Sequence, residues 1–273
     1  MKKVIILGST GMLGSAVGAY FEKIEGMKIY LSYRNEEVKY GKNVFYFDPL
    51  IEDTWKNIPE LEDAYVINCI GTIKPFMDSN IEAAILINSH FPHRLATLCK
   101  EKNAKLIHIT TDCVFSGREG EYTEESLHDA LDSYGKSKSI GEPVKNAMVI
   151  RTSIIGPEIH KDASLVAWVK SMAGKDAKGF LNHFWNGVTT KQYAKVCEHI
   201  IREDLYEIGL FHVFSPQTVN KHELLQLIND KYALNINISA VSVDQPVDRT
   251  LSTIKDLNGV LRVPSLVEQI EEM

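Results

Sequence analysis

The stretch Val4-Ile5-Ile6-Leu7-Gly8-Ser9-Thr10-Gly11-Met12-Leu13-Gly14 decides the fold class of this chain. A short apolar run leads into a turn whose glycines are three residues apart, and a helix is expected to begin near Met12. In a nucleotide-binding crossover the first glycine permits the tight turn, the second lets backbone approach a pyrophosphate, and the third lets helix pack on strand. The N–H groups at the helix start then hold the anion.

The place of these glycines between a strand and a helix is stronger evidence for a dinucleotide-binding loop than their spacing. Gly-x-x-Gly-x-x-Gly is a shorter and commoner string than Gly-x-Gly-x-x-Gly, and an ordinary strand-to-helix turn is the alternative. Here the string follows an apolar strand and precedes an α/β pattern, a context that favours a dinucleotide-binding loop. The candidate cofactor-binding residues of this loop are Gly8, Thr10, Gly11, Met12, Leu13 and Gly14.

Short Val/Ile-rich runs recur along the chain and alternate with amphipathic helical stretches, which is typical of a parallel sheet covered by helices. We therefore predict an α/β fold, a Rossmann-like doubly wound parallel sheet with a smaller, discontinuous C-terminal substrate-binding lobe. The predicted strands are Val4–Leu7, Lys28–Ser32, Val44–Phe47, Ala64–Ile70, Lys105–Thr110, Met148–Thr152 and Leu210–Phe214. The predicted helices include Ile81–Cys99, Tyr134–Lys145, Lys191–Arg202 and Lys221–Leu234, and 174–179 is expected to be a polar loop.

The composition excludes several classes of protein. With 273 residues, 30 Lys+Arg against 36 Asp+Glu and a net charge of -6, the chain carries no overall charge that would attract nucleic acid or an anionic membrane. Its four cysteines are too widely spaced for a Cys-x-x-Cys metal or redox site. No apolar run approaches the ~20 residues of a membrane span. We expect a soluble, cytoplasmic protein without a bound metal.

The end of the second predicted strand bears on cofactor choice. An acidic residue there binds the ribose hydroxyls of NAD, whereas an arginine accommodates the 2′-phosphate of NADP. Here the strand runs into Tyr33-Arg34-Asn35, with no carboxylate before Glu36. Arg34 and the Ser32 hydroxyl therefore favour NADPH, with NADH possible, although Arg34 as a solvated loop cation is an equal alternative.

These elements suggest how the chain is divided. Residues 1–153 are expected to form the NADP-binding domain, to which residues 186–214 return because Leu210–Phe214 reads as another buried strand. Residues 154–185 and 215–273 would then form the substrate-binding lobe.

Tyr134 and Lys138 place a phenol and an ammonium one helical turn apart. A lysine cation beside a tyrosine favours the phenolate and lowers the phenol pKa from about 10, so that proton exchange with a carbonyl becomes feasible near neutral pH. Chance alone gives roughly one Tyr-x-x-x-Lys in a chain of this composition, so the neighbouring residues must support the pair. Upstream, Leu106–Asp112 reads as a buried strand that ends in hydroxyls, at the sheet edge where open α/β folds bind ligands.

The sequence at this point resembles the extended short-chain dehydrogenase/reductases, and in particular the dTDP-4-dehydrorhamnose reductases. The resemblance is strong up to Ser153 and weaker beyond it. It rests on His108-Ile109-Thr110-Thr111-Asp112-Cys113-Val114-Phe115-Ser116-Gly117, Tyr122-Thr123-Glu124, Tyr134-Gly135-Lys136-Ser137-Lys138, Gly141-Glu142 and Ile150-Arg151-Thr152-Ser153, and more faintly on Asn186-Gly187-Val188-Thr189 and Pro246-Val247-Asp248-Arg249.

The resemblance implies an NADPH-dependent reduction of the 4-keto group of a nucleotide-linked sugar. It makes Thr111, Tyr134 and Lys138 the catalytic residues, with Tyr134 and Lys138 also binding cofactor. It places Cys69-Ile70-Gly71 beside the cofactor and Asp48 near the adenine, although a turn residue before Pro49 explains Asp48 equally well. The candidate substrate-binding residues are Thr111, Asp112, Cys113, Ser153, Trp185, Asn186 and Arg249, of which Arg249 is the candidate for the diphosphate.

Cys113 leaves a second chemistry open. The rhamnose reductases generally have tyrosine at this position, whereas GDP-fucose synthases have a cysteine base two residues after the catalytic serine, as Cys113 stands two after Thr111. A 3,5-epimerase/4-reductase would use this thiolate, with His160 or His183 as the opposing acid. The alternative is that Cys113 is a small apolar wall of the pocket.

A different class of protein also carries this motif set. The regulatory subunit of methionine adenosyltransferase resembles the same reductases and acts as a nucleotide-bound partner protein, so a non-catalytic role stays open. Helices Ile81–Cys99 and Tyr134–Lys145 resemble the pair through which many members of the superfamily dimerise, which favours a homodimer.

Overall fold

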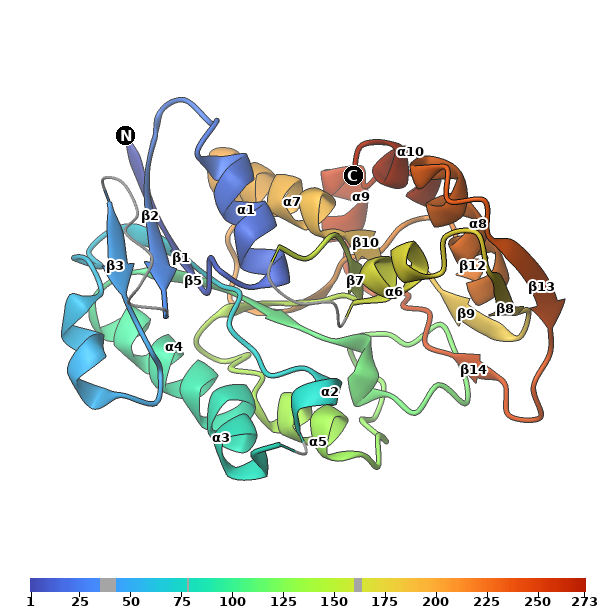
Figure 1. Cartoon of the computed structure of the whole chain (residues 1–273). Coiled ribbons are helices and arrows are strands. Elements are labelled where there is room, and N and C mark those ends of the chain that lie inside the picture. Colours follow the sequence, from blue (N-terminus) through green and yellow to red (C-terminus); the bar gives the residue numbers. More distant parts are fainter. Residues whose placement is uncertain (35–42, 78, 160–163) are drawn as a thin grey trace. The chain divides into compact units, whose positions relative to one another are not determined.

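The computed structural model describes residues 1–34, 43–77, 79–159 and 164–273 (Figure 1). Its strands are β1 Lys2–Leu7, β2 Met27–Tyr33, β3 Val44–Tyr46, β4 Ala64–Asn68, β5 Lys105–Thr110, β6 Met148–Arg151, β7 Ile154–Ile155, β8 Asp176–Phe180, β9 His183–Trp185, β10 Val188–Thr189, β11 Gly209–His212, β12 Val219–Asn220, β13 Asn237–Val241 and β14 Val247–Asp248. Its helices are α1 Met12–Phe21, α2 Lys74–Met77, α3 Ile81–Ile85, α4 Phe91–Glu101, α5 Ser133–Ile140, α6 Leu165–Ser171, α7 Thr190–Arg202, α8 Lys221–Tyr232, α9 Leu257–Leu261 and α10 Leu266–Glu271. Short 3-10 turns cover Glu52–Asn57 and Asp112–Val114, and Leu86–His90 forms a π-helical turn.

A seven-stranded sheet has the order β11-β6-β5-β4-β1-β2-β3. The pairs β1 with β2, β1 with β4, β2 with β3 and β4 with β5 are parallel. The predicted α/β fold is confirmed, and each of the seven predicted strands supplies one strand of this sheet. The strand order reverses between β1 and β4, which in open α/β sheets is where ligands bind beyond the carboxyl ends.

Alternation along β1 explains how this sheet is covered on both faces. Ile5 and Leu7 share a core cluster with Phe91 and Leu95 of α4, while the intervening Val4 and Ile6 are equally buried. On the α1 side, α7 runs beside α1 in Figure 1, and Tyr20 Oη donates to Glu198 Oε2 (3.2 Å).

The described chain divides into two compact units. Unit 1 is 1–110, 132–150 and 194–210, and unit 2 is 111–131, 151–193 and 211–273. In unit 2, a core cluster that includes Val166 of α6, Leu224 of α8 and Leu266 of α10 packs with the small strands β8, β9, β12 and β13. The sequence-based division into cofactor and substrate regions concerns ligand binding and stays a prediction. The compact units differ from it most clearly by grouping 111–131 with the later residues.

Two local predictions were wrong. The expected polar loop 174–179 mostly belongs to β8, which pairs in parallel with β13 from Asp176↔Asn237 to Phe180↔Val241. The expected helix Tyr134–Lys145 ends at Ile140, because Gly141 closes it and a β-carbon there would lie 1.8 Å from the Asn88 carbonyl oxygen.

Candidate functional site

The glycine loop in unit 1 is built so that only glycine fits its two ends. Gly8 has a φ of +83°, and a β-carbon at Gly14 would lie 2.0 Å from the Gly8 carbonyl oxygen. Gly11 is the N-cap of α1 and no side chain caps the helix there. The first N–H groups of α1 are therefore oriented as a dinucleotide-binding loop requires, and the residues present fit such a cofactor.

The end of β2 braces this loop. The Gly8 N–H donates to Ser32 Oγ (2.8 Å), and the Ser9 N–H donates to the Ser32 carbonyl (3.2 Å). Ser32 is buried, so its hydroxyl supports the loop, whereas we had expected it to add to a phosphate contact. Arg34, just beyond the strand, is exposed, while Asn35 and Glu36 lie outside the described residues.

Asp48 makes a turn contact. Its Oδ1 accepts from the Leu50 N–H (2.9 Å), and its backbone N–H donates to Thr54 Oγ1 (3.1 Å). This is the Asx turn expected before Pro49. The adenine role of Asp48 stays a prediction.

The loop after β4 packs against the glycine loop. A β-carbon at Gly8 would lie 2.8 Å from Ile70 Cγ1. Burial raises the pKa of the Cys69 thiol well above its ordinary value, so Cys69 stays protonated. Three of the predicted cofactor-binding residues, Gly8, Cys69 and Ile70, thus lie together at the carboxyl ends of β1 and β4.

Asn88, which no sequence motif pointed to, holds the loop after Gly71. It lies in the π-helical turn, a rare geometry often found at functional sites. Asn88 Oδ1 accepts from the Thr72 N–H (2.8 Å), and Asn88 Nδ2 donates to the Thr72 carbonyl (2.9 Å) and to Ser137 Oγ (3.2 Å). The signal for this residue was an asparagine among apolar positions, where a polar group needs partners.

Helix α5 carries Tyr134 and Lys138 on consecutive turns. Asp132 caps the helix by accepting from the Gly135 N–H (3.0 Å). Tyr134 is half-buried, whereas Lys138 is buried and its Nζ donates to the Ile109 carbonyl (3.2 Å). Burial lowers the pKa of Lys138 to about 8, against an opposing effect of Glu142. A β-carbon at Gly71 would lie 3.9 Å from Lys138 Nζ, which puts the ammonium beside the loop after β4.

In unit 2, Thr111, Asp112 and Cys113 form a short turn directly after β5. Thr111 Oγ1 accepts from the Cys113 N–H (3.1 Å) and donates to Asp112 Oδ1 (3.1 Å). Thr111 and Asp112 are buried and Cys113 is half-buried. The hydroxyl and the carboxylate therefore shape the turn that presents Cys113.

Arg249 and Lys221 bring positive charge to this part of unit 2. Arg249 Nε donates to the Phe115 carbonyl (2.9 Å) and Nη2 donates to the Ser116 carbonyl (3.1 Å). Burial lowers the pKa of Lys221, whose charge interacts favourably with Asp112 and Cys113 and unfavourably with Arg249. The sequence analysis did not identify Lys221, because it reads as an ordinary cation at the start of α8.

The other predicted substrate-binding residues are largely engaged in packing. Asn186 Nδ2 donates to the Leu251 carbonyl (2.8 Å), and its Oδ1 accepts from the Leu251 N–H (2.9 Å). Trp185 is buried, with Lys221 Nζ 5.6 Å from its ring centroid. The Ser153 carbonyl accepts from the Val188 N–H (2.8 Å). Contact with a substrate stays a prediction for all three.

Of the two candidate acids for an epimerase, only His183 belongs to the described residues, and its contacts there are with Gln245 and Phe180. His183 Nε2 lies 3.3 Å from the Gln245 carbonyl, and its ring packs on Phe180 (4.8 Å between centroids). His160 lies outside the described residues.

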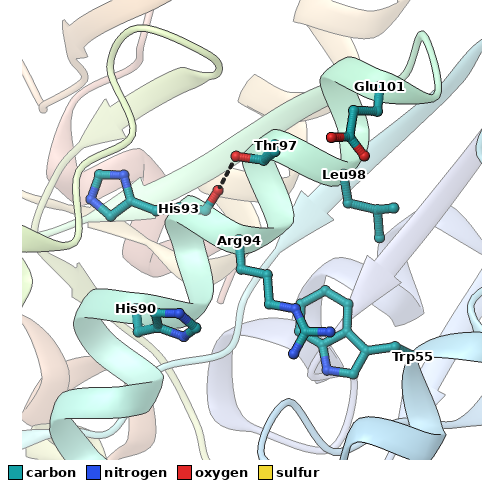
Figure 2. Close-up of a pocket in the computed structure, with 7 residues that line it drawn as sticks. All are labelled: Trp55, His90, His93, Arg94, Thr97, Leu98 and Glu101. Atoms are coloured by element: carbon teal, nitrogen blue, oxygen red, sulfur yellow. Dashed lines mark hydrogen bonds between the residues drawn. The ribbon is translucent and has the colours of Figure 1, made fainter.

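A surface hollow of about 590 Å³ lies on α4 of unit 1. Figure 2 shows the Arg94 guanidinium over the Trp55 indole, 3.9 Å from the ring centroid. Arg94 also forms a double hydrogen bond with the Glu52 carboxylate (2.7 and 2.5 Å). The lining residues are Trp55, His90, His93, Arg94, Thr97, Leu98 and Glu101.

Metal-ligating clusters and membrane-spanning helices are both absent from the described residues. Within residues 1–34, 43–77, 79–159 and 164–273, no group of three or more His, Cys, Asp or Glu side chains is arranged to hold a metal ion. Among those same residues, no helix is both long and apolar enough to cross a bilayer.

Curated relatives of the chain include both a probable reductase and a subunit of a methionine adenosyltransferase. It is 27% identical over 275 residues to a probable low-salt glycan biosynthesis reductase, Agl14, of Haloferax volcanii, covering 93% of this chain and 90% of that protein. It is 27% identical over 261 residues to methionine adenosyltransferase 2 subunit beta of Danio rerio, covering 90% of this chain and 78% of that protein.

Solved structures share the fold. The dTDP-4-dehydrorhamnose reductase of Bacillus anthracis, solved in complex with NADP, matches with a TM-score of 0.80 at 22% identity over 100% of this chain and 98% of that one. A hypothetical dTDP-4-dehydrorhamnose reductase from Sulfolobus tokodaii matches with a TM-score of 0.77 at 21% identity over 98% and 99%. The family model described as the RmlD substrate binding domain matches residues 1–251, so the chain belongs to that family and has the extended short-chain dehydrogenase/reductase fold, as the sequence motifs predicted.

Proposed function

We propose that this protein is an NADPH-dependent reductase of the 4-keto group of a nucleotide-linked deoxysugar. The observation that carries the proposal is the environment of Lys138. Its ammonium is buried, lies beside the loop after Gly71 in the same unit as the glycine loop, and follows Tyr134 by one helical turn. Burying an ammonium without a carboxylate bonded to it is costly, so a role in binding and catalysis explains it better than a role in stability.

NADPH, when bound, supplies the hydride that converts the C4 ketone to an alkoxide. The backbone at Gly11 and the first N–H groups of α1 would hold its diphosphate, while Gly8 and Gly14 shape the turn that brings them there. Tyr134 would donate the proton to the new alkoxide. The family resemblance gives the Thr111 hydroxyl the role of a hydrogen-bond donor to the substrate oxygen. Lys138 would hold the nicotinamide ribose, and its charge would favour the phenolate of Tyr134.

Arg34 supports the choice of NADPH over NADH. It follows β2, whose Ser32 braces the glycine loop, and it is exposed to pair with a 2′-phosphate. Replacing Arg34 with Ala should weaken NADPH binding by about tenfold or more and leave NADH binding unchanged, because only NADPH carries the phosphate. Equal weakening for both cofactors would contradict this role.

Lys221 gives a specific reason to keep the epimerase alternative. Its ammonium acts on Cys113, and a nearby cation favours the thiolate that could remove a proton alpha to the ketone. A bifunctional 3,5-epimerase/4-reductase therefore remains the second candidate. The third is a non-catalytic regulatory subunit, which the methionine adenosyltransferase relatives favour.

One experiment separates the three candidates. NADPH oxidation is followed in D2O with a panel of nucleotide-linked 4-keto-6-deoxy sugars, and the product is analysed by mass. Reduction without deuterium on ring carbons supports the simple reductase. Ring deuterium that disappears in Cys113→Ser supports the epimerase-reductase. NADPH binding without turnover of any sugar would overturn the enzymatic proposal in favour of the regulatory role.

The catalytic assignment has its own test. Tyr134→Phe removes the proton donor and should lower kcat by about 10² to 10⁴ while NADPH still binds. Tyr30→Phe is the matched control, because Tyr30 is a half-buried tyrosine of β2 on the same unit. If Tyr134→Phe oxidises NADPH at the normal rate with a keto sugar, the assignment is wrong.

We also propose that the protein is a homodimer formed through α3, α4 and α5. These helices and the π-helical turn between α3 and α4 expose Ile81, Ile85, Leu86 and Ile140. His93 Nε2 lies 2.6 Å from the Ile140 carbonyl, which ties α4 to the end of α5. Exposed aliphatic side chains on neighbouring elements are typical of an interface. Light scattering should give twice the chain mass, and Ile85→Asp should give the monomer; a wild-type monomer contradicts the proposal.

A further inference from the structure

Two polar side chains of β5, His108 and Thr110, lie on the side of the sheet that α4 covers. Leu106 packs in a core cluster with Phe91 and Leu95 of α4, so alternation directs His108 and Thr110 to the same side of the sheet. On that side, Thr110 Oγ1 donates to Glu142 Oε1 (2.9 Å). His108 is completely buried there.

The hydrogen bonds of Asn68 fix the proton on His108. Asn68 Oδ1 accepts from the Ile70 N–H (3.0 Å), which leaves Asn68 Nδ2 as the donor to His108 Nδ1 (3.0 Å). A ring nitrogen that accepts a hydrogen bond carries no proton, so the neutral imidazole carries its proton on Nε2. Burial, and then the charge of Lys138, lowers the pKa of His108 well below its ordinary value and keeps it neutral.

Two buried N–H donors, on His108 and Lys138, can each make a further hydrogen bond. His108 Nε2 is buried and makes no hydrogen bond within the described part of the chain. The Lys138 ammonium has three donors, and the one hydrogen bond that the described residues give it goes to the Ile109 carbonyl (3.2 Å). Two N–H donors cannot bond each other, whereas one oxygen between them can accept from both, and buried waters typically serve groups of this kind.

We propose that His108 is a positioning residue for Lys138, acting through one buried water that accepts from His108 Nε2–H and from Lys138 Nζ. The same chain of contacts reaches the glycine loop, because Asn68 orients Ile70, whose side chain packs at Gly8. The consequence for catalysis rests on the proposed function, in which Lys138 holds the cofactor ribose and tunes Tyr134.

The charges around His108 come from two helices. Lys138 acts on His108 from α5 and His93 acts on it from α4, while Asn68 of β4 is its neutral partner and Glu142, just after α5, acts on Lys138. Glu142 raises the pKa of Lys138, whereas burial lowers it more. A water that accepts from the ammonium would stabilise its charged form, so its loss should lower the Lys138 pKa further.

Two substitutions separate the two nitrogens of His108. His108→Asn places an amide oxygen where Nδ1 stood, so it keeps the bond from Asn68 and removes Nε2. His108→Gln reaches the position of Nε2 with an amide and gives up the Asn68 bond. His90→Asn is the control, since His90 is an exposed histidine of the neighbouring π-helical turn.

The readout is the titration of Lys138 in protein labelled with ¹³C at the lysine ε-carbon and assigned by Lys138→Arg, with no substrate present. The midpoint should fall by about one pH unit in His108→Asn, the equivalent of one lost hydrogen bond to a charged group, and should stay with the wild type in His108→Gln and His90→Asn. A folded His108→Asn protein that titrates as the wild type overturns the proposal.

A second measurement needs no variant and covers the case in which His108→Asn does not fold. The ¹⁵N resonances of the wild-type His108 ring should show the Nε2–H tautomer throughout, and the Nε2 resonance should shift with the midpoint of Lys138. An Nε2 resonance that ignores the Lys138 titration overturns the proposal. Because neither measurement uses a sugar, failure of the proposed reductase activity would be seen separately, in the NADPH assay.

Discussion

Lys138 in unit 1 and Arg151 in unit 2 are both buried cations, but their surroundings differ. In unit 2, Arg151 is fully buried over the Phe115 ring (5.0 Å), with Nη1 2.9 Å from His212 Nε2 and Nη2 2.6 Å from His128 Nε2. In unit 1, Lys138 is buried with one hydrogen bond from the described residues, to the Ile109 carbonyl. Both cations lie beside a neutral histidine, but the arginine is far better satisfied.

The polar cluster around Arg151 in unit 2 is closed, in the sense that its groups hydrogen-bond one another. His212 accepts from Arg151 through Nε2 and donates through Nδ1 to the Ser252 carbonyl (2.7 Å). Glu124 accepts from the His212 N–H, the Thr253 hydroxyl and the Ile254 N–H. A closed polar network specifies a fold, whereas an open one near a sheet edge is costly unless a ligand completes it. We therefore interpret Arg151 as structural and Lys138 as functional.

The largest expected effect comes from opening the closed cluster. Arg151→Met leaves the buried His212 Nε2 without its donor and removes the stacking on Phe115, so we expect a loss of about 3 kcal/mol in the free energy of unfolding. Urea denaturation measures it. Arg202→Met is the matched control, because Arg202 is an exposed arginine paired with Glu198 of its own helix, and it should change little. Equal losses of stability from both substitutions would contradict the structural role of Arg151.

Lys138→Met should act in the opposite direction on stability. Burial lowers the pKa of Lys138 from 10.5 to about 8, so at pH 7 the folded state carries a charge that the unfolded state holds more favourably. Removing that charge should raise the free energy of unfolding by about 2 kcal/mol at pH 7 and abolish turnover. Lys136→Met, an exposed lysine of the same helix, is the control.

The stability difference between Lys138→Met and the wild type should depend on pH. Between pH 8 and 10.5 the unfolded lysine is protonated and the folded one is not, so wild-type stability rises with pH across this range. The advantage of Lys138→Met should therefore shrink above pH 8 and vanish near pH 10.5. A variant that is less stable than the wild type at pH 7 would show that Lys138 is structural, like Arg151.

The sequence predicts the large sheet better than it predicts these polar clusters or the small strands of unit 2. Buried parallel strands are continuous apolar runs, so all seven strands of the large sheet could be located, and the spacing of Tyr134 and Lys138 identified one helical face. The strand β8 was not predicted, because its Asp-Ala-Lys-Gly-Phe sequence is stabilised by pairing with β13, some 60 residues later along the chain.

Residues that act through distant partners could not be located by local spacing. His108 meets Asn68 across 40 positions and Asn88 meets Ser137 across 49, in each case through strand or helix pairing that only the fold creates. Lys221 acquires its role from Asp112 and Cys113 in the same way. The sequence shows which residues can do chemistry, and the fold decides which of them meet.

Acid should destabilise the protein through two buried histidines, His212 beside Arg151 and His108 beside Lys138. Burial, followed by the charge of Arg151, lowers the pKa of His212 to about 4, so as pH falls below about 6.5 the unfolded chain binds a proton that the folded chain does not. Stability should therefore fall with pH from 6.5 to 4, by up to about 1.4 kcal/mol per unit for this residue.

His212→Gln keeps an acceptor for Arg151 and cannot titrate, so it should remove this part of the slope and leave the part due to His108. Thermal unfolding between pH 4 and 7 measures both, with His90→Gln as the exposed control. If the slope is unchanged in His212→Gln, the histidine is not kept neutral in the folded state, and the description of its cluster as closed and uncharged fails.

The smallest effect on stability is expected for a cation whose hydrogen-bond partner is exposed at the surface. Arg94 lies over Trp55 and binds Glu52 with two hydrogen bonds, so by contact geometry it is as well partnered as Arg151 (Figure 2). Its partner Glu52 is exposed, however, and water replaces what such a pair loses. Arg94→Met should therefore leave the midpoint of thermal unfolding within the scatter of repeated measurements. A loss comparable to that of Arg151→Met would mean that the number of partners, and not burial, decides how much a cation contributes in this protein.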